Sequence, residues 1–264
     1  MNVTRGLICA GGEATRLGEL TRVTNKHLLP VGKWPMIYYS LQLFQLCGIR
    51  EVMIVTGQNH AGDFIDLLGD GQVYDRDSGS PLFDLDLTYK VQTEPGGIAQ
   101  VVGMAESFVA GGKLVVCLGD NLFEYAEVEK IHAFSRGEFP AQIFVKEVSD
   151  PERFGVVSYD DNKRVNDVVE KAGVVDTRYD IPPSSDAVVG LYCFPPDVFS
   201  LIKTLNPSSR GELEITDVNR AYAEQGQLKL SRISGWWRDA GTQESLAEIG
   251  SLIEKTGSNK VFQR

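Results

Sequence analysis

Apolar strand-like runs alternate with amphipathic helix-like segments through the first half of the chain. Strands are predicted at 3–9, which ends in the apolar run Leu7-Ile8-Cys9, and at 51–55, 87–91 and 113–118. Apolar residues at helical spacing predict helices at 36–47, 61–69 and 98–108. This rhythm is typical of a mostly parallel sheet with right-handed crossovers. Between two of these segments, the polar and turn-rich stretch 72–84 is expected to form a surface loop.

Shorter strands separated by turns characterise the second half. They are predicted at 141–145, 155–159, 165–170 and 187–194. Helices are predicted at 196–205, at 214–225 and, after a Thr242 N-cap, up to residue 254. The fold class is therefore predicted as α/β, with a mostly parallel central sheet covered by helices on both faces and a smaller antiparallel part. No linker divides the chain, so residues 1–264 are expected to form one domain.

A glycine pair ends the first predicted strand and is followed by two cations. At Gly11 and Gly12 a backbone without Cβ atoms can approach a ligand closely, and the N–H groups of such a loop suit phosphate oxygens. Arg16 and Lys26 follow, and a flexible loop could fold both cations over a bound anion. The pattern indicates an anion-binding loop, although a glycine pair after a strand is often only a tight turn.

Two common phosphate-binding motifs do not match this loop. The dinucleotide fingerprint requires G-x-G-x-x-G and an acidic residue at the end of the next strand. Here the loop reads G-G-E-A-T-R-L and the next strand ends in Val55-Thr56-Gly57. The P-loop requires G-K-[ST] at the start of a helix, whereas Gly32-Lys33 is followed by tryptophan and proline. Neither an NAD-binding motif nor a P-loop is therefore expected.

Composition and charge narrow the possible partners. The chain has 264 residues, enough for a large core, and a net charge of −10. A nucleic-acid partner is not expected, because binding a phosphate backbone requires a basic face. No apolar run is long enough for a membrane span or a signal peptide, so we expect a cytoplasmic protein without a membrane partner. Four cysteines lie in apolar runs without C-x-x-C pairing and are expected to be reduced core residues: Cys9, Cys47, Cys117 and Cys193.

The glycine loop and the segment after it, N-K-H-L-L-P-V-G-K-W-P-M-I-Y-Y, resemble the signature of the sugar-1-phosphate nucleotidylyltransferases, most closely the glucose-1-phosphate thymidylyltransferase branch. The resemblance continues in seven ordered blocks: V-Q-T-E-P-G-G-I-A-Q, L-G-D-N, D-P-E-R-F-G-V-V, V-E-K, A-V-V-G-L-Y, R-G-E-L-E-I-T-D-V-N and G-W-W-R-D-A-G-T. It implies a Rossmann-like nucleotidyltransferase fold with a nucleotide-binding half at 1–125 and a sugar-binding half at 126–264.

The resemblance also implies an enzyme that makes dTDP-glucose and pyrophosphate from dTTP and glucose 1-phosphate by in-line displacement, with Mg²⁺ as cofactor. Because the two substrates are both polyanions, a protein must supply positioning, positive charge and magnesium rather than a nucleophile. No Ser-His-Asp or Cys-His set is needed for such chemistry. For His27, inside the signature loop, a packing or hydrogen-bonding role is expected.

By matching motif positions, the resemblance implies that Arg16 and Lys26 are catalytic residues that contact the phosphates. It also implies that Gly11 and Gly12 bind substrate, as the glycine loop itself indicates. An arginine fork suits phosphate oxygens and stays charged. Asp120 follows a predicted buried strand, at the edge of the sheet where ligands of such folds collect. Magnesium prefers such hard oxygen ligands. Asp120 and Asp239 correspond to the family's metal carboxylates, so their side chains are expected to converge on one Mg²⁺ ion. Asp120 is also predicted to bind substrate.

Other matching positions imply base and sugar contacts. Gln92 and Gly97 correspond to residues that recognise the base, and an amide can pair with the edge that thymine and uracil share. The sugar and its phosphate would be bound on the other half of the chain. The residues implied there are Gly155, Glu170 and Val188 for the hexose and Lys171 and Arg210 for the phosphate.

Four positions depart from the family pattern. Ala14 stands where glycine is usual, and Ser40 and Ala172 each replace a proline. Arg238 precedes the predicted metal ligand Asp239, where it could compete with a cation or point away. Two alternatives stay open beside thymidylyl transfer. One is the same chemistry with UTP or another hexose 1-phosphate. The other, for which Ala14 and Arg238 are the two reasons, is a catalytically silent nucleotide-sugar sensor. A homo-oligomer is expected in each case.

Overall fold

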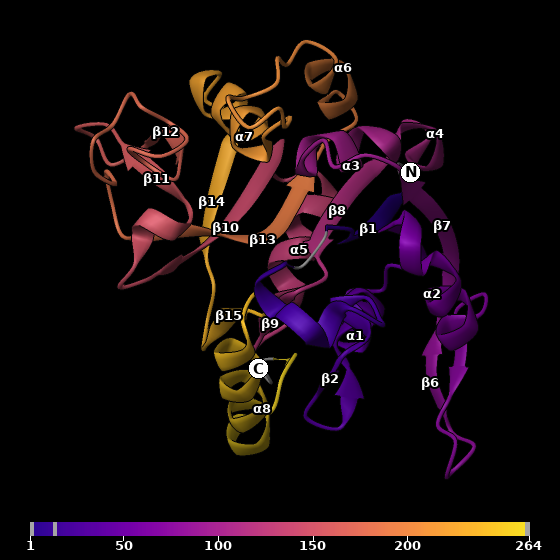
Figure 1. The fold of residues 1–264 in the computed structure, drawn as a ribbon. Helices are drawn as coiled ribbons and strands as arrows, with labels where there is room; N and C mark the ends of the chain where they lie inside the picture. Colours follow the sequence, from indigo (N-terminus) through magenta and orange to yellow (C-terminus); the bar gives the residue numbers. More distant parts are fainter. Residues whose placement is uncertain (1–2, 13–14, 262–264) are drawn as a thin grey trace. The chain divides into compact units, whose positions relative to one another are not determined.

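A computed structural model describes residues 3–12 and 15–261, with the side chains of residues 15 and 16 excluded. The chain forms two compact units (Figure 1). Unit 1 comprises Met1–Val3, Gly96–Val116 and Glu129–Ile233, and unit 2 comprises Thr4–Pro95, Cys117–Val128 and Ser234–Arg264. The chain passes between the units more than once. The division into halves at residue 125 stays a prediction.

Three parallel strands form the centre of unit 2, as the apolar runs predicted. They are β1 (Thr4–Ala10), β4 (Glu51–Gly57) and β7 (Asp86–Gln92), in the order β1-β4-β7. Their connections carry the predicted helices α1 (Met36–Leu46) and α2 (Ala61–Leu68). In register, Ala10 lies beside Thr56 and Gly57 beside Gln92, so the three strands end at one edge. Whatever binds at the carboxyl ends of these strands meets residues from all three.

Short strand pairs and a final helix complete unit 2. β2 (Pro30–Val31) pairs with β3 (Trp34–Pro35), and β9 (Asn121–Phe123) pairs with β15 (Trp237–Asp239). The expectation of a surface loop at 72–84 is wrong, because β5 (Gln72–Tyr74) and β6 (Pro81–Asp84) form a hairpin there. Helix α8 (Gln243–Thr256) contacts β2 and β15. It begins at the predicted N-cap Thr242, which forms a capping box with Ser245.

Antiparallel pairing dominates the strands of unit 1. β13 (Asp186–Phe194) pairs antiparallel with β10 (Ala141–Glu147) and with β11 (Gly155–Tyr159), and β11 pairs antiparallel with β12 (Val165–Glu170). These four strands were predicted with almost the same bounds. β14 (Leu228–Arg232), which was not predicted, runs parallel to β10. β8 (Lys113–Leu118) has the predicted bounds and crosses from one unit into the other.

The helices of unit 1 pack on these strands and on one another. The predicted helix at 98–108 is divided into α3 (Ile98–Met104) and α4 (Glu106–Val109). α5 (Val128–Arg136) was not predicted. α6 (Val198–Ile202) is shorter than expected, and α7 (Ile215–Glu224) matches its prediction closely. α7 packs mainly against β12, with β14 as a second neighbour, and thereby covers the strand that carries Glu170.

The cysteines and the helices bear on two further expectations, one about the protein interior and one about membrane spans. The four cysteines are buried thiols, as expected for reduced core residues. Burial raises the pKa of the Cys47 thiol to about 12, which keeps it protonated and unreactive. Across residues 3–12 and 15–261, none of the helices combines the length and the apolar character needed to cross a bilayer.

Candidate active site

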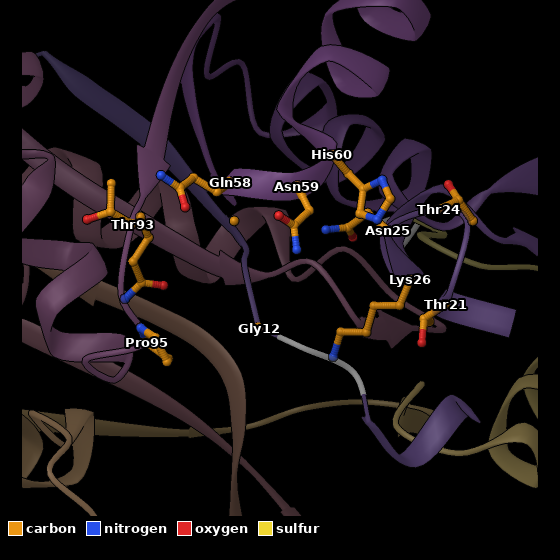
Figure 2. Close-up of a pocket in the computed structure, with 12 residues that line it drawn as sticks. Gly12, Thr21, Thr24, Asn25, Lys26, Gln58, Asn59, His60, Thr93 and Pro95 are labelled. Atoms are coloured by element: carbon orange, nitrogen blue, oxygen red, sulfur yellow. The ribbon is translucent and has the colours of Figure 1, made fainter. Parts of the chain in front are cut away.

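A cavity of about 480 Å³ opens in unit 2 where the three parallel strands end (Figure 2). This volume is within the range of small-molecule sites. The lining residues are mostly polar and come from the glycine loop, the segment before α1, the β4 end and the β7 end: Gly12, Thr21, Thr24, Asn25, Lys26, Gly57, Gln58, Asn59, His60, Gln92, Thr93 and Pro95. Two of the predicted substrate-binding residues, Gly12 and Gln92, and the predicted catalytic Lys26 therefore line one cavity.

The two glycines of the predicted anion-binding loop have distinct reasons to be glycine. A Cβ on Gly11 would lie 3.1 Å from the Gln92 side-chain oxygen, so the loop approaches Gln92 more closely than most side chains would permit. Gly12 has φ +96°, which is strained for any residue with a Cβ. Gly11 and Gln92, predicted to bind phosphate and base, thus lie next to each other. The Arg16 side chain and Ala14 fall outside the described residues.

Asn25 fixes the turn that carries Lys26. It is buried, its Nδ2 donates to the Ala10 carbonyl at 3.1 Å, and its Oδ1 accepts from the His27 backbone N–H at 2.9 Å. The same oxygen lies 2.6 Å from His27 Nδ1, which fits a neutral imidazole with its proton on Nδ1. This bonding shapes the single turn Lys26–Leu28 and ties it to the end of β1. The position of Lys26 is therefore set by the strand that leads into the glycine loop.

His27 has the packing and hydrogen-bonding role that was expected. It is 1% exposed, and burial together with the neighbouring Lys26 charge lowers its pKa to about 3. A Cβ on Gly119 would lie only 2.7 Å from the imidazole, so glycine at 119 leaves room for the ring. At neutral pH His27 is an uncharged core residue.

Lys26 and Asp120 form an ion pair although they are 94 positions apart in the chain. Their side chains are 13% and 19% exposed, and Asp120 also accepts a hydrogen bond from Asn121 Nδ2 at 2.8 Å. Burial alone would raise the Asp120 pKa, but the Lys26 ammonium, together with smaller contributions that include the Asn121 hydrogen bond, holds that pKa below its ordinary value. Asp120 is therefore ionised at neutral pH. The predicted phosphate-binding cation and the predicted metal carboxylate neutralise each other here.

Asp239, the second predicted metal ligand, lies beside Asp120 at the backbone level. β15 pairs antiparallel with β9 so that Asp239 is opposite Asn121, and the Ala240 N–H donates to the Asp120 carbonyl at 2.7 Å. Within the described residues, His, Cys, Asp and Glu side chains form no group of three or more that could hold a metal ion. Asp120 and Asp239 carry hard carboxylate oxygens of the kind that Mg²⁺ prefers, and this ion often takes its other ligands from substrate phosphates and water.

Arg238, which could have competed for Asp239, binds another carboxylate. Its Nε and Nη2 donate to Glu248 Oε1 of α8 at 2.9 and 2.7 Å, and its Nη1 donates to the Trp237 carbonyl. Successive residues of a strand point to opposite faces, so Arg238 and Asp239 on β15 point away from each other. This arrangement removes one of the two reasons for considering a silent sensor.

The predicted sugar and sugar-phosphate residues form a second group, within unit 1. Gly155 is paired with Glu170 across β11 and β12, and a Cβ on Gly155 would lie 3.1 Å from the Glu170 carboxylate. Glu170 Oε2 accepts a hydrogen bond from Thr216 Oγ1 at 2.7 Å. Its Oε1 lies 3.7 Å from Lys171 Nζ and 3.8 Å from Arg210 Nη2. Three of the predicted residues, Gly155, Lys171 and Arg210, thus lie around the carboxylate of a fourth, Glu170.

The two remaining predicted residues of unit 1, Val188 and Gly97, lie outside the Glu170 group. Val188 lies on β13 opposite Val145 and is half-buried. Gly97, with φ +88°, passes so close to the Leu213 backbone that a Cβ would meet the Leu213 carbonyl at 2.4 Å. This contact joins the start of α3 to the segment that follows Arg210. Gly97 is in unit 1 and its predicted partner in base recognition, Gln92, is in unit 2.

Sequence reasoning missed the residues that orient the predicted site residues. Asn25, Thr216 and Arg220 each hold a predicted residue or its turn through hydrogen bonds. Asn25 and Thr216 lie inside the matching blocks N-K-H and E-I-T-D, so their position carried a signal. Arg220 looks like an ordinary polar residue on an amphipathic helix, and no sequence pattern distinguishes it.

Comparison with known proteins gives consistent results. The nucleotidyl transferase family matches residues 5–256. The chain is 39% identical over 254 residues to a glucose-1-phosphate thymidylyltransferase of Neisseria gonorrhoeae, covering 95% of this chain and 82% of that protein. It is 35% identical over 257 residues to a low-salt glycan biosynthesis nucleotidyltransferase, Agl11, of Haloferax volcanii, covering 97% of this chain and 68% of that protein.

Solved structures agree with the predicted fold class. A Bacillus anthracis protein assigned as a glucose-1-phosphate thymidylyltransferase, solved with sucrose, has a TM-score of 0.84 at 41% identity, covering 99% of this chain and 98% of that one. A UDP-glucose pyrophosphorylase solved with UDP-glucose has a TM-score of 0.83 at 20% identity, covering 96% and 99%, and shows the fold alone. The predicted α/β fold, with a mostly parallel central sheet and smaller antiparallel parts, is confirmed.

Proposed function

The chain belongs to the nucleotidyl transferase family of enzymes, and on this basis we propose that it makes dTDP-glucose from dTTP and glucose 1-phosphate. In the reaction, a phosphate oxygen of glucose 1-phosphate attacks the α-phosphorus of dTTP. One P–O bond forms, the bond between the α-phosphorus and the β-bridging oxygen breaks, and pyrophosphate leaves with that oxygen. No covalent enzyme intermediate is required, so the protein contributes alignment and charge neutralisation.

The nucleotide is proposed to bind in the cavity of unit 2. Gln92 can pair with the base through its amide, which both donates and accepts. The backbone at Gly11 and Gly12 can approach the triphosphate, and Lys26 and Arg16 are proposed to contact its phosphates. For Arg16 this proposal comes from the sequence resemblance. Lys26 is positioned by Asn25 at the cavity wall, which supports its part in the proposal.

Asp120 and Asp239 are proposed to hold Mg²⁺, which would neutralise phosphate charge and polarise the phosphoryl oxygens when bound. Asp120 is ionised and its partner Lys26 is a flexible, compact cation. When the triphosphate enters, Lys26 can exchange the Asp120 carboxylate for a phosphate oxygen. Asp120 would then be released from its ion pair at the moment when a metal carboxylate is required.

Glucose 1-phosphate is proposed to bind at the Glu170 group of unit 1. The Glu170 carboxylate can accept hydrogen bonds from sugar hydroxyls, and Lys171 and Arg210 offer positive charge for the phosphate. Arg210 is also bonded to Glu214 at 2.8–2.9 Å, which fixes its guanidinium fork. Glycine at 155 leaves open space beside the carboxylate. Val188 and Gly97 are proposed as further sugar and base contacts, on the resemblance alone.

The observation that carries this proposal is the ion pair between Lys26 and Asp120 beside Asp239, at a cavity lined by Gln92 and Gly12. In the proposed reaction Lys26 would supply a cation for phosphate, the two aspartates carboxylates for a metal, and Gln92 an amide for the base. UTP is the second candidate nucleotide, because the base edge that Gln92 can read is shared by thymine and uracil. A methyl group in a pocket separates the two by only about 1–3 kcal/mol.

The test is pyrophosphate release by the purified wild-type protein with Mg²⁺ and glucose 1-phosphate, using dTTP and UTP in parallel. We expect release that requires both substrates and is faster with dTTP at equal concentrations. Faster release with UTP would replace thymidylyl by uridylyl transfer. Binding of dTTP without any release, across a panel of hexose 1-phosphates, would support a nucleotide-sugar sensor instead. Homo-oligomerisation stays a prediction, which sedimentation velocity can test.

A further inference from the structure

Glu170 and Lys171 stand at the start of a closed turn that follows β12. Lys171 has φ +42°, a left-handed conformation that is unusual for a residue with a side chain. Its carbonyl accepts from the N–H groups of Val174 and Val175 at 3.0 Å, and the Asp176 N–H donates to the Glu170 carbonyl at 3.0 Å. The direction of the Lys171 side chain therefore depends on the turn 171–176 remaining closed.

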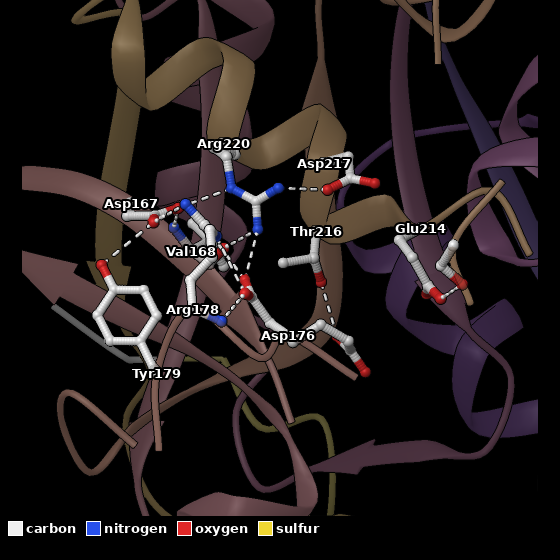
Figure 3. Close-up of polar contacts among 11 residues, drawn as sticks. Asp167, Val168, Asp176, Arg178, Tyr179, Glu214, Thr216, Asp217 and Arg220 are labelled. Carbon is white, nitrogen blue, oxygen red and sulfur yellow. Dashed lines mark hydrogen bonds and ion pairs between the residues drawn. The ribbon is translucent and has the colours of Figure 1, made fainter. Parts of the chain in front are cut away.

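Arg220 of α7 fastens this turn to β12 and to its own helix (Figure 3). Its Nη2 donates to Asp176 Oδ2 at 3.0 Å and to the Val168 carbonyl at 3.0 Å. Its Nε donates to Asp167 Oδ1 at 2.8 Å, and its Nη1 donates to Asp217. The Asp167 and Asp176 side chains are only 10% and 9% exposed. One guanidinium thus joins the strand, the turn and the helix.

The helix that carries Arg220 also orients the Glu170 carboxylate. Thr216 lies four residues before Arg220, one helical turn away and on the same face. Its hydroxyl donates to Glu170 Oε2 at 2.7 Å, and the residue is 3% exposed. The face of α7 that covers β12 therefore positions both Glu170 and Lys171. Thr216 holds the Glu170 carboxylate, and Arg220 holds the backbone turn that begins at Lys171.

We propose that Arg220 is a positioning residue for the sugar phosphate. By clamping the turn 171–176 between β12 and α7, it holds Glu170 and Lys171 in the orientation that receives glucose 1-phosphate. The inference rests on the proposed function, because it assigns Arg220 a part in binding the second substrate of that reaction. Arg220 itself has no contact with the substrate in this account, since its donors are directed to Asp167, Val168, Asp176 and Asp217.

Arg178 supplies a matched control. It binds the same two carboxylates, with Nη1 2.9 Å from Asp167 Oδ2 and Nη2 2.6 Å from Asp176 Oδ2. In contrast to Arg220, it belongs to the segment just after the turn, its side chain is 50% exposed, and these ion pairs join it to side chains of β12 and of the turn rather than to α7. Losing Arg178 removes a positive charge from the same cluster while the link between the turn and the helix remains.

The experiment compares steady-state kinetics of the wild type, R220Q, R220K and R178Q with dTTP and glucose 1-phosphate. For R220Q we expect KM for glucose 1-phosphate to rise about tenfold or more, while KM for dTTP changes less than about twofold. R220K keeps the charge but cannot bond all four partners of the guanidinium, so an intermediate rise is expected. R178Q should stay within about twofold of wild type for both substrates.

The KM comparison separates positioning from folding. A purely structural loss lowers the active fraction and hence the apparent kcat, with both KM values unchanged. Unchanged KM for glucose 1-phosphate in R220Q, or equal effects of R220Q and R178Q, would overturn the inference and leave the proposed function intact. If R220Q does not fold, R220K against R178Q gives the same decision. A wild type that releases no pyrophosphate with any hexose 1-phosphate would instead overturn the proposed function.

Discussion

In unit 2 the Lys26 ammonium and the Asp120 carboxylate bind each other directly, whereas in unit 1 the Glu170 carboxylate stays 3.7 Å from Lys171 and 3.8 Å from Arg210. In the first group the charged residues proposed to act on substrate are each other's partners. In the second group, neutral and backbone contacts hold the carboxylate, through Thr216 and the pairing of Gly155 with Glu170.

The difference indicates how each proposed substrate would enter. A triphosphate must displace Asp120 from Lys26, so binding there is an exchange of one anion for another. In unit 1 the cations are only loosely engaged with Glu170, and Glu214 holds Arg210, so binding of a sugar phosphate there depends on how well the group is held in place. Substitutions in unit 2 should therefore affect the chemical step, and those in unit 1 should affect KM for the sugar phosphate. Four predictions test this contrast.

The largest effect is expected for Asp120→Asn. The change removes a carboxylate proposed to hold Mg²⁺ and leaves Lys26 without its anionic partner. We expect kcat to fall about 100-fold or more. Pyrophosphate release at saturating substrates measures it. Asp84→Asn is the control, because Asp84 is an exposed partner of Arg50, and it should retain wild-type kcat. A kcat within about threefold of wild type in Asp120→Asn would refute the assigned role.

The next effect is on stability and comes from His27. Its pKa is lowered to about 3 in the folded protein, against about 6.5 for an unperturbed histidine. Below pH 6.5 His27 binds a proton in the unfolded chain but stays neutral in the folded chain, so the free energy of unfolding falls as the pH drops toward 3. From pH 7 to pH 5 this costs about 2 kcal/mol.

Denaturant unfolding at pH 7 and pH 5, in the wild type and in His27→Gln, measures the contribution. The variant should lose about 2 kcal/mol less than the wild type over this interval, because the other titrating groups are common to both proteins. Equal losses in the two proteins would show that His27 is not buried in its neutral form.

A smaller effect is expected for Glu170→Gln. The neutral amide keeps the size of the side chain but weakens hydrogen bonds to sugar hydroxyls and removes the charge near Lys171 and Arg210. KM for glucose 1-phosphate should rise about tenfold, or about 1.4 kcal/mol, with KM for dTTP unchanged. Glu106→Gln is the control, since Glu106 forms an exposed pair with Lys203. A selective change in KM for dTTP would reverse the assignment of the two units.

The smallest effect is expected for Arg238→Gln. The ion pair of Arg238 with Glu248 is about half exposed, and such pairs contribute about 1 kcal/mol or less to stability. Because Arg238 points away from Asp239, kcat should stay within about twofold of wild type. The Mg²⁺ concentration that gives half-maximal rate should stay within the same range. A tenfold change in the Mg²⁺ concentration that gives half-maximal rate would show that Arg238 acts on the metal site after all.

Segments with strong hydrophobic patterns were predictable. β8, β11 and β12 were predicted with their observed bounds, because continuous or alternating apolar residues specify a buried strand. The hairpin of β5 and β6 was missed because its strands have only three and four residues and the connection 75–80 is polar and turn-rich, so the whole stretch resembles a loop. β9 and β15 have three residues each and depend on pairing across more than 100 positions.

The site shows a similar division. Gly11, Gly12, Lys26 and Asp120 could be selected because they lie in recognisable blocks at the ends of strands. That Lys26 binds Asp120, or that Asn25 sets the turn between them, could not be derived, because hydrogen bonds between distant segments leave no local periodicity. The contacts of Arg220 in unit 1 could not be derived for the same reason. Its contacts with Asp167 and Asp176 span 53 and 44 positions.

The most direct test of the proposed reaction uses dTTP labelled with ³²P at the α-phosphorus, together with Mg²⁺ and unlabelled glucose 1-phosphate. If a sugar-phosphate oxygen attacks that phosphorus, the label must appear in dTDP-glucose and the released pyrophosphate must be unlabelled. Label that remains in dTTP, or that appears only in dTMP after attack by water, would contradict transfer to the sugar phosphate.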